Sequence, residues 1–123
     1  MIAVLAWAGV GVLGAVGALA RFRVGVAVAR RQQSDFPAGT FVVNISGAFA
    51  LGLLTGLSLT SDLMLILGTG FLGGYTTFST WMVESQRLGE DGAWPLLHLY
   101  LFGSMFAGLV AAGAGWLSGG LIA

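Results

Sequence analysis

Residues 69–82, TGFLGGYTTFSTWM, decide the fold of this chain because they combine an apolar character with features that oppose a continuous helix. No charged residue occurs between Asp62 and Glu84. Yet the adjacent Gly73 and Gly74 are followed by four hydroxyl-bearing residues within five positions. Each glycine costs a helix about 1 kcal/mol relative to alanine, and threonine hydroxyls can bond to carbonyls one turn earlier. We therefore expect a membrane-crossing segment that is broken near its middle.

The composition of the whole chain is that of an integral membrane protein. Of 123 residues, 57% are hydrophobic and only 8% are charged, whereas a soluble domain carries about 25% charged residues. The mean hydropathy is +0.93. The absence of cysteine excludes disulfides and thiolate metal sites. A net charge of zero provides no electrostatic footprint for nucleic acid, so we expect no nucleic-acid partner.

Four apolar spans can be drawn, each close to or above the ~20 residues that a helix needs to cross the hydrocarbon core. They cover residues 2–29, 39–59, 63–88 and 94–122. The short connectors between them leave no room for a soluble domain. We therefore predict an all-α integral membrane protein in which residues 1–123 form a single transmembrane domain of four helices.

The break within residues 73–77 has two interpretations. Backbone groups without partners are tolerated at membrane depth only inside protein or beside water. An unwound turn would free carbonyl oxygens there, and such carbonyls are how membrane proteins hold small cations without a carboxylate. The alternative is a simple kink in which the threonine hydroxyls are satisfied in place. The pattern alone leaves both interpretations open.

Polar residues on the other spans indicate a polar lining. One face of the second span carries Thr40, Asn44 and Gly47, and the fourth span carries Tyr100 and Ser104 one turn apart. The third span contributes the hydroxyls of Thr76, Thr77, Ser79 and Thr80. An asparagine in a span is costly and faces the bundle interior, so an Asn44 that only bridges helices is the alternative interpretation.

The charged residues exclude several kinds of transporter. No acidic residue lies deep within a span, and the nearest, Glu84, is about a turn from the end of the third. Proton-coupled transport and a small four-helix multidrug exchanger, which need an embedded carboxylate, are therefore disfavoured. His98 is expected at an interface. No nucleophile–base pair or metal cluster can be assembled, so we expect no enzyme.

The remaining lining suits a small anion. Hydroxyl and amide donors, together with the partly positive edges of aromatic rings, can replace the water around an anion without binding it too tightly. Arg21 supplies one candidate cation near a mouth of the pathway. The alternative role for Arg21 is that of an anchor reaching from the helix end to the membrane surface.

Three motifs resemble signatures of the bacterial fluoride channels, the CrcB/Fluc family. They are GAVGALAR at residues 14–21, GTFVVNISG at 39–47 and GFLGGYTTFST at 70–80. Chain length and span count agree as well, so the resemblance covers essentially the whole chain. It implies a passive, fluoride-selective channel of the bacterial inner (plasma) membrane that exports F⁻ and relieves fluoride toxicity.

The resemblance also implies an assembly and a set of site residues. Family members are antiparallel, dual-topology dimers with two fluoride pores and a structural sodium ion at the centre. Here the backbone carbonyls of Gly73 and Thr76 would hold the sodium ion. The implied vestibule residues are Arg21 and Glu84. With the hydroxyls already described, the predicted anion pathway comprises Asn44, Thr77, Phe78, Ser79, Thr80, Trp81, Tyr100 and Ser104.

Three features depart from the family pattern. Trp81 stands where many members have a second phenylalanine, and Gly108 and Ala112 occupy turns where a hydroxyl track usually continues. The third is charge bias: the first and third connectors are flanked by Arg21, Arg23, Arg30, Arg31 and Arg87, whereas the second has none. That bias favours one orientation. The second subunit is therefore either the same chain or a related, oppositely oriented one. A further alternative is that this chain is itself a helper subunit, which only packs against a conducting partner.

Overall fold

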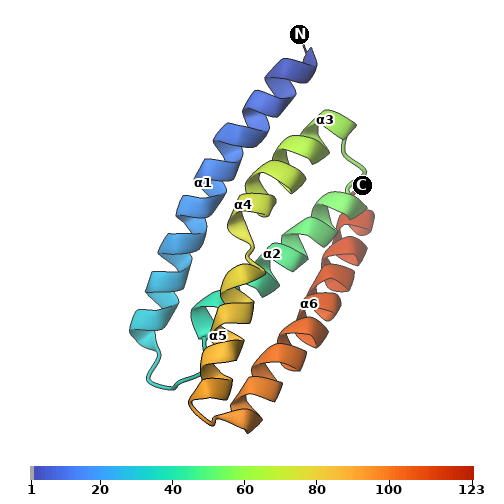
Figure 1. Ribbon diagram of the computed structural model, residues 1–123. Helices are drawn as coiled ribbons and strands as arrows, with labels where there is room; N and C mark the ends of the chain where they lie inside the picture. The colour runs from blue at the N-terminus through green and yellow to red at the C-terminus, as the bar shows by residue number, and fades with distance from the viewer. Residues whose placement is uncertain (1) are drawn as a thin grey trace.

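The computed structural model describes residues 2–123, and over that range the chain is all-helical (Figure 1). In chain order the elements are α1 (Ile2–Arg31), α2 (Ala38–Gly56), α3 (Ser61–Met64), the π-helix η1 (Leu65–Leu72), α4 (Gly73–Tyr75), α5 (Ser79–Glu90) and α6 (Trp94–Ile122). The predicted all-α class is confirmed.

Three of these helices, α1, α2 and α6, are long and apolar enough to cross a membrane. They contain 30, 19 and 29 residues, and their most apolar 18-residue windows have mean hydropathies of 2.2, 1.6 and 1.6. Large apolar side chains such as Val4, Phe106 and Leu109 are at least 70% exposed on the subunit. Such exposure is stable in lipid and not in water. The chain is a multi-pass membrane protein.

The bounds of the helices differ in detail from the expected spans. The span expected at 2–29 corresponds to a helix that continues to Arg31, and the one expected at 39–59 ends at Gly56. The earlier end has a local cause, because Ser58 adopts a positive φ of 56°. A residue in that conformation just past a helix terminates it.

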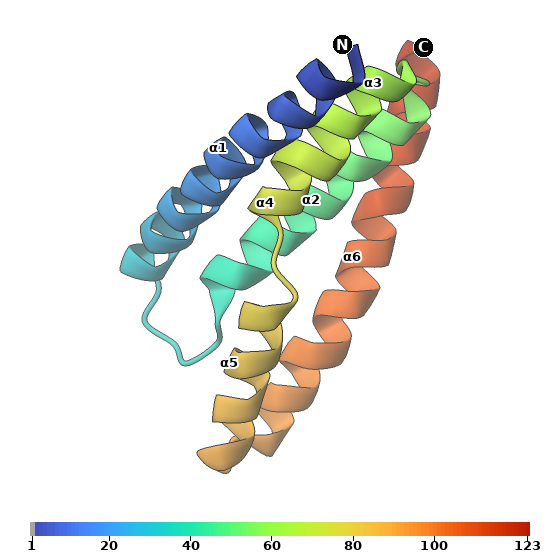
Figure 2. The same cartoon turned by 45° about the horizontal axis from the view of Figure 1, so that its top comes forward.

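Glycines let α2 and α6 approach closely along their lengths, and both views show the two helices side by side (Figures 1 and 2). A Cβ added at Gly52 would collide with the Ala112 carbonyl, and one added at Gly115 would collide with the Phe49 carbonyl. Small residues at such positions allow backbone contact between membrane helices. The α2–α6 pair therefore forms one closely packed unit.

Residues 61–90 do not form one helix. The helices α3, η1 and α4 follow one another directly as far as Tyr75. Thr76 then adopts an extended conformation with φ −81° and ψ 158°, and helical geometry resumes with α5. Figure 2 shows the interruption as a stretch of open chain between α4 and α5. We call residues 76–78 the interruption.

The interruption begins at Thr76, inside the range 73–77 where the break was expected but after the two glycines. Gly73 and Gly74 are both helical, as the first residues of α4. Gly74 is instead needed for packing on α1, because a Cβ added there would collide with the Gly14 carbonyl. Gly17 makes a similar close approach to the Phe71 carbonyl. The interruption therefore overlaps the expected break at residues 73–77 but does not open at the glycine pair, which packing on α1 keeps helical.

Gly74→Ala is expected to lower the free energy of unfolding by about 1–3 kcal/mol, because the added methyl group must push α1 away from α4. Gly11→Ala is the matched control on α1, since nothing lies within 4 Å of its added Cβ. Thermal unfolding midpoints of both variants in one detergent provide the measurement. Equal midpoints for the two variants would contradict the close approach of α1 and α4.

Candidate functional site

Asn44 of α2 holds the interruption in place. Its Nδ2 donates a hydrogen bond to the Thr77 carbonyl, and the Thr77 N–H donates one back to Oδ1, both at 2.9 Å. The side-chain amide thus acts as a neighbouring peptide group would in a sheet. It satisfies both backbone polar groups of a buried residue that has left the helix.

This pairing frees carbonyl oxygens on the preceding turn. In a continuous helix the Thr77 N–H would donate to the Gly73 carbonyl, four residues earlier, but here it donates to Asn44. Likewise the Thr80 N–H donates to the Thr77 hydroxyl at 3.1 Å and not to the Thr76 carbonyl. The Thr76 carbonyl instead accepts a long contact of 3.5 Å from Nη1 of Arg21. The carbonyls of Gly73 and Thr76 therefore lie outside the helical ladder.

The hydroxyls around the interruption are largely engaged within the protein. The Thr76 hydroxyl donates to the Leu72 carbonyl at 2.9 Å. The Thr77 hydroxyl, which accepts from the Thr80 N–H, lies 3.2 Å from Oγ1 of Thr80 and 3.4 Å from Oγ of Ser79. A threonine oxygen that accepts from the first turn of a helix stabilises that end. These side chains build the start of α5.

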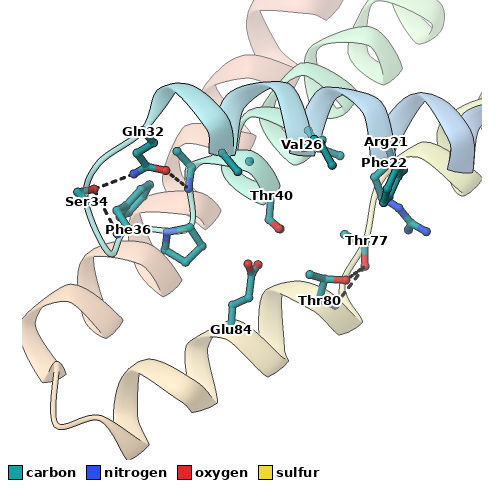
Figure 3. Close-up of a pocket in the computed structure, with 16 residues that line it drawn as sticks. Arg21, Phe22, Val26, Gln32, Ser34, Phe36, Thr40, Thr77, Thr80 and Glu84 are labelled. Carbon is teal, nitrogen blue, oxygen red and sulfur yellow. Dashed lines mark hydrogen bonds between the residues drawn. The ribbon is translucent and has the colours of Figure 1, made fainter.

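A first cavity of about 440 Å³ lies between the end of α1, the connector 32–37, the start of α2 and α5 (Figure 3). Its polar lining includes Arg21, Thr40, Thr77, Thr80 and Glu84. Glu84 extends from α5 into the cavity toward Thr40 in Figure 3. The structure thus brings both predicted vestibule residues, Arg21 and Glu84, to one cavity.

Tyr100 orients the Glu84 carboxylate from outside the cavity lining. Its hydroxyl donates to Oε1 of Glu84 at 3.0 Å, and the tyrosine is 0% exposed. The Phe36 ring meets the Tyr100 ring edge-on at a centroid separation of 5.4 Å. Phe36 belongs to the polar connector, and no periodicity in the sequence connects it with Tyr100. Its only local signal is a large aromatic residue directly before Pro37.

A second cavity of about 530 Å³ adjoins the first, since Thr77 lines both. Its lining is mainly apolar, with Asn44, Thr76, Thr77, Trp81 and Ser104 as the polar members. Phe78 also lines this cavity, with 69% of its surface exposed. The Phe78 ring contacts Trp81 edge-on, with the centroids 5.7 Å apart. The interruption is thus the point where a polar and an apolar cavity meet.

Most of the predicted site residues lie on one of the two cavities, and a few do not. Gly73 lines the second cavity. Ser79 is exposed and lines neither. Tyr100 does not line the first cavity but contacts two residues that do, Glu84 and Phe36. His98 is exposed and contacts its own helix through the Trp94 carbonyl at 2.7 Å.

One polar pair near the interruption was not anticipated from the sequence. Oγ of Ser46 lies 2.9 Å from the Tyr75 hydroxyl, and the Tyr75 ring stacks on Phe71 at a centroid distance of 5.9 Å. Ser46 is only two positions from Asn44, but it projects from a different face of α2. The polar face of Asn44 does not include Ser46, and the pattern of that face therefore does not predict the contact between Ser46 and Tyr75.

Comparison with known proteins finds one family model and a set of relatives named as fluoride-specific ion channels. The family described as "CrcB-like protein, Camphor Resistance (CrcB)" matches residues 8–116. A fluoride-specific ion channel FluC 2 of Mycolicibacterium paratuberculosis is 56% identical over 91 residues, covering 74% of this chain and 75% of that protein. One of Mycobacterium bovis is 50% identical over 113 residues, 91% and 90% of the two chains. A FluC 1 channel of Carboxydothermus hydrogenoformans is 44% identical over 110 residues, 89% of each.

Asn44→Ala is expected to lower the free energy of unfolding by about 2–4 kcal/mol, because it leaves the Thr77 N–H and carbonyl without partners. Thr55→Ala is the control on the same helix, since it removes an exposed hydroxyl that only contacts the Leu51 carbonyl of its own turn. Unfolding in a single detergent, followed by circular dichroism, compares the two. If Asn44→Ala is no less stable than Thr55→Ala, the amide does not hold the interruption.

Proposed function

This chain belongs to the CrcB family of fluoride channels, and from that premise we propose that it conducts F⁻ passively out of the bacterial cell. It is a fluoride channel and not an enzyme. Hydrofluoric acid enters cells as a neutral molecule and ionises inside, so a passive path for the anion suffices for export. Such export relieves fluoride toxicity at the inner (plasma) membrane.

The observation that carries the proposal is the meeting of the two cavities at Thr77. The polar cavity offers an arginine and several hydroxyls to an arriving anion. The apolar cavity adds the edge-on pair of Phe78 and Trp81, and ring edges carry partial positive charge. An anion that leaves water would contact hydrogen-bond donors in the polar cavity and then ring edges in the apolar cavity. Such contacts favour passage over tight binding.

We also propose that residues 61–90 make the fourth membrane crossing, as the broken helix of a four-helix subunit. Two such subunits in antiparallel orientation would form the dimer with two pores. The exposed apolar surface of α1 and α6, which includes Phe22, Phe102 and Phe106, supports burial against lipid or a second subunit. This arrangement makes the chain a single transmembrane domain.

The backbone around Gly73 and Thr76 fits a structural sodium ion. Their carbonyls lie outside the helical ladder, and Gly73 is exposed on the subunit surface, where a second subunit could complete the oxygen shell. The contact from Arg21 leaves the second lone pair of the Thr76 carbonyl unused. A bound cation would offset the dipoles of these carbonyls and so stabilise the interruption.

Removal of sodium is expected to lower the thermal unfolding midpoint, because an ion bound only by the folded state stabilises it by mass action, by about 2.7 kcal/mol at 100 times its Kd. N-methyl-D-glucamine replaces sodium at constant ionic strength, and restoring sodium is expected to restore the midpoint. A midpoint that does not depend on sodium would contradict the assigned carbonyl site.

The arginines support a fixed orientation in the membrane. Arg30 and Arg31 end α1 and Arg87 lies in the last turn of α5. These two helix ends lie at the same end of the molecule in both views, opposite the chain termini (Figures 1 and 2). Because positive residues are retained in the cytoplasm, a related chain of opposite orientation is a candidate partner beside a second copy of this chain.

Liposomes that hold only this purified chain are expected to release fluoride rapidly and to retain chloride, with protein-free liposomes as the control. Ion-selective electrodes measure both anions side by side. Folded protein that releases no fluoride would point to an obligatory partner or to a packing subunit, and co-reconstitution with a related subunit would then be the next test. Chloride release at a similar rate would contradict selectivity.

A further inference from the structure

Three of the five polar side chains that line the second cavity have their hydrogen bonds within the protein. Asn44 pairs with the Thr77 backbone through its carbonyl and one N–H. The Thr76 hydroxyl donates to Leu72, and the Thr77 hydroxyl bonds with Thr80. These three side chains therefore maintain the interruption. They offer a passing ion little beyond the second N–H of Asn44.

The remaining two polar side chains, Trp81 and Ser104, are different. Nε1 of Trp81 and Oγ of Ser104 are both shielded from solvent and have no hydrogen-bond partner among residues 2–123. Ser104 is only 8% exposed. The two atoms come from α5 and α6, yet their residues line the same cavity. A buried donor without a partner destabilises the fold. Two such donors at one cavity therefore indicate that a bound ligand accepts their hydrogen bonds.

The chemistry of the pair selects an anion. An indole N–H is a donor only, and a serine hydroxyl can rotate to donate. The side chains of Ile45, Met105 and Leu109, which line the same cavity, have no oxygen atom that could bind a cation. The Phe78 ring packed edge-on against Trp81 adds a weakly positive ring edge to the same region.

We propose that Trp81 and Ser104 together form an anion subsite, in which one fluoride ion accepts hydrogen bonds from the indole N–H and the serine hydroxyl. The inference rests on the proposed function. It assigns to Trp81 a role in selecting fluoride among the ions that enter the cavity. The next positions on the same face of α6 as Ser104 are Gly108 and Ala112, which have no hydroxyl. The indole therefore supplies a donor where α6 supplies none.

A fluoride titration followed by NMR tests binding directly. The chain has four tryptophans, so ¹⁵N-labelled protein in micelles has four indole N–H signals to assign. Trp81→Phe identifies the Trp81 signal by its loss; should that variant not fold, the corresponding variants of the other three assign it by elimination. Fluoride is expected to shift the Trp81 signal saturably and to leave the signal of Trp116, which is 57% exposed, in place. Chloride and gluconate are expected to shift neither.

Fluoride efflux from liposomes supplies the second test. Trp81→Phe keeps an aromatic ring and removes the donor, and Ser104→Ala removes the other donor. Each is expected to slow fluoride efflux about tenfold or more, the equivalent of one hydrogen bond to a charged group. Because both donors serve one ion, the double variant is expected to lose less than the product of the single losses. Trp116→Phe is the matched control, expected to conduct like the wild type.

The outcomes separate this proposal from the channel function itself. A wild type that conducts fluoride, with an unmoved Trp81 signal and a Trp81→Phe variant of normal rate, overturns the subsite and leaves the channel function intact. A wild type that does not conduct contradicts the function of the chain alone, and the titration still decides the subsite by the presence or absence of a saturable shift. An equal shift with chloride or gluconate also overturns it.

Discussion

The reciprocal hydrogen bonds between the Asn44 amide and the Thr77 backbone are the interaction on which the rest of this structure depends. At membrane depth each unpaired peptide group costs several kcal/mol, so a helix can open only where another group takes over its bonds. By taking the Thr77 N–H, Asn44 releases the Gly73 carbonyl. It also positions the Thr77 hydroxyl, which accepts from the first turn of α5. One side chain thus supports both the freed carbonyls and the restarted helix.

Glycines provide the space in which this interaction can form. A Cβ at Gly47, one turn after Asn44, would collide with the Thr76 methyl group, and one at Gly74 would collide with the Gly14 carbonyl. The first contact brings α2 against the interruption itself, and the second brings α1 against the helix that precedes it. Close packing of apolar helices and the geometry of the polar site are therefore the same structural feature, since larger residues at these positions would separate Asn44 from Thr77.

The polar residues of the site divide into two kinds by their hydrogen bonds. Asn44, Thr76 and Thr77 bond to the protein and hold the interruption in its conformation. Trp81 and Ser104 have buried donors with no partner among residues 2–123, and these are the donors that the proposed subsite would use. In the first cavity Tyr100 similarly orients Glu84 without lining the cavity itself. Polarity alone does not distinguish the two kinds, because it does not show which donors the protein already satisfies.

Sequence by itself determined the helical class, the membrane environment and the family, because hydropathy and the three motifs are local properties of the chain. It also placed Asn44 on a polar face and predicted a break within residues 73–77. Only the tertiary structure decided that the opening falls at residues 76–78, since Gly74 is held in a helix by its packing on α1. The pairing of Phe36 with Tyr100, and of Ser46 with Tyr75, likewise emerged only in the fold. The same holds for the donors of Trp81 and Ser104, which have no partner in the described part of the chain. The physical reason is common to all of these: whether a buried polar atom is satisfied depends on partners from distant segments, which no local pattern encodes.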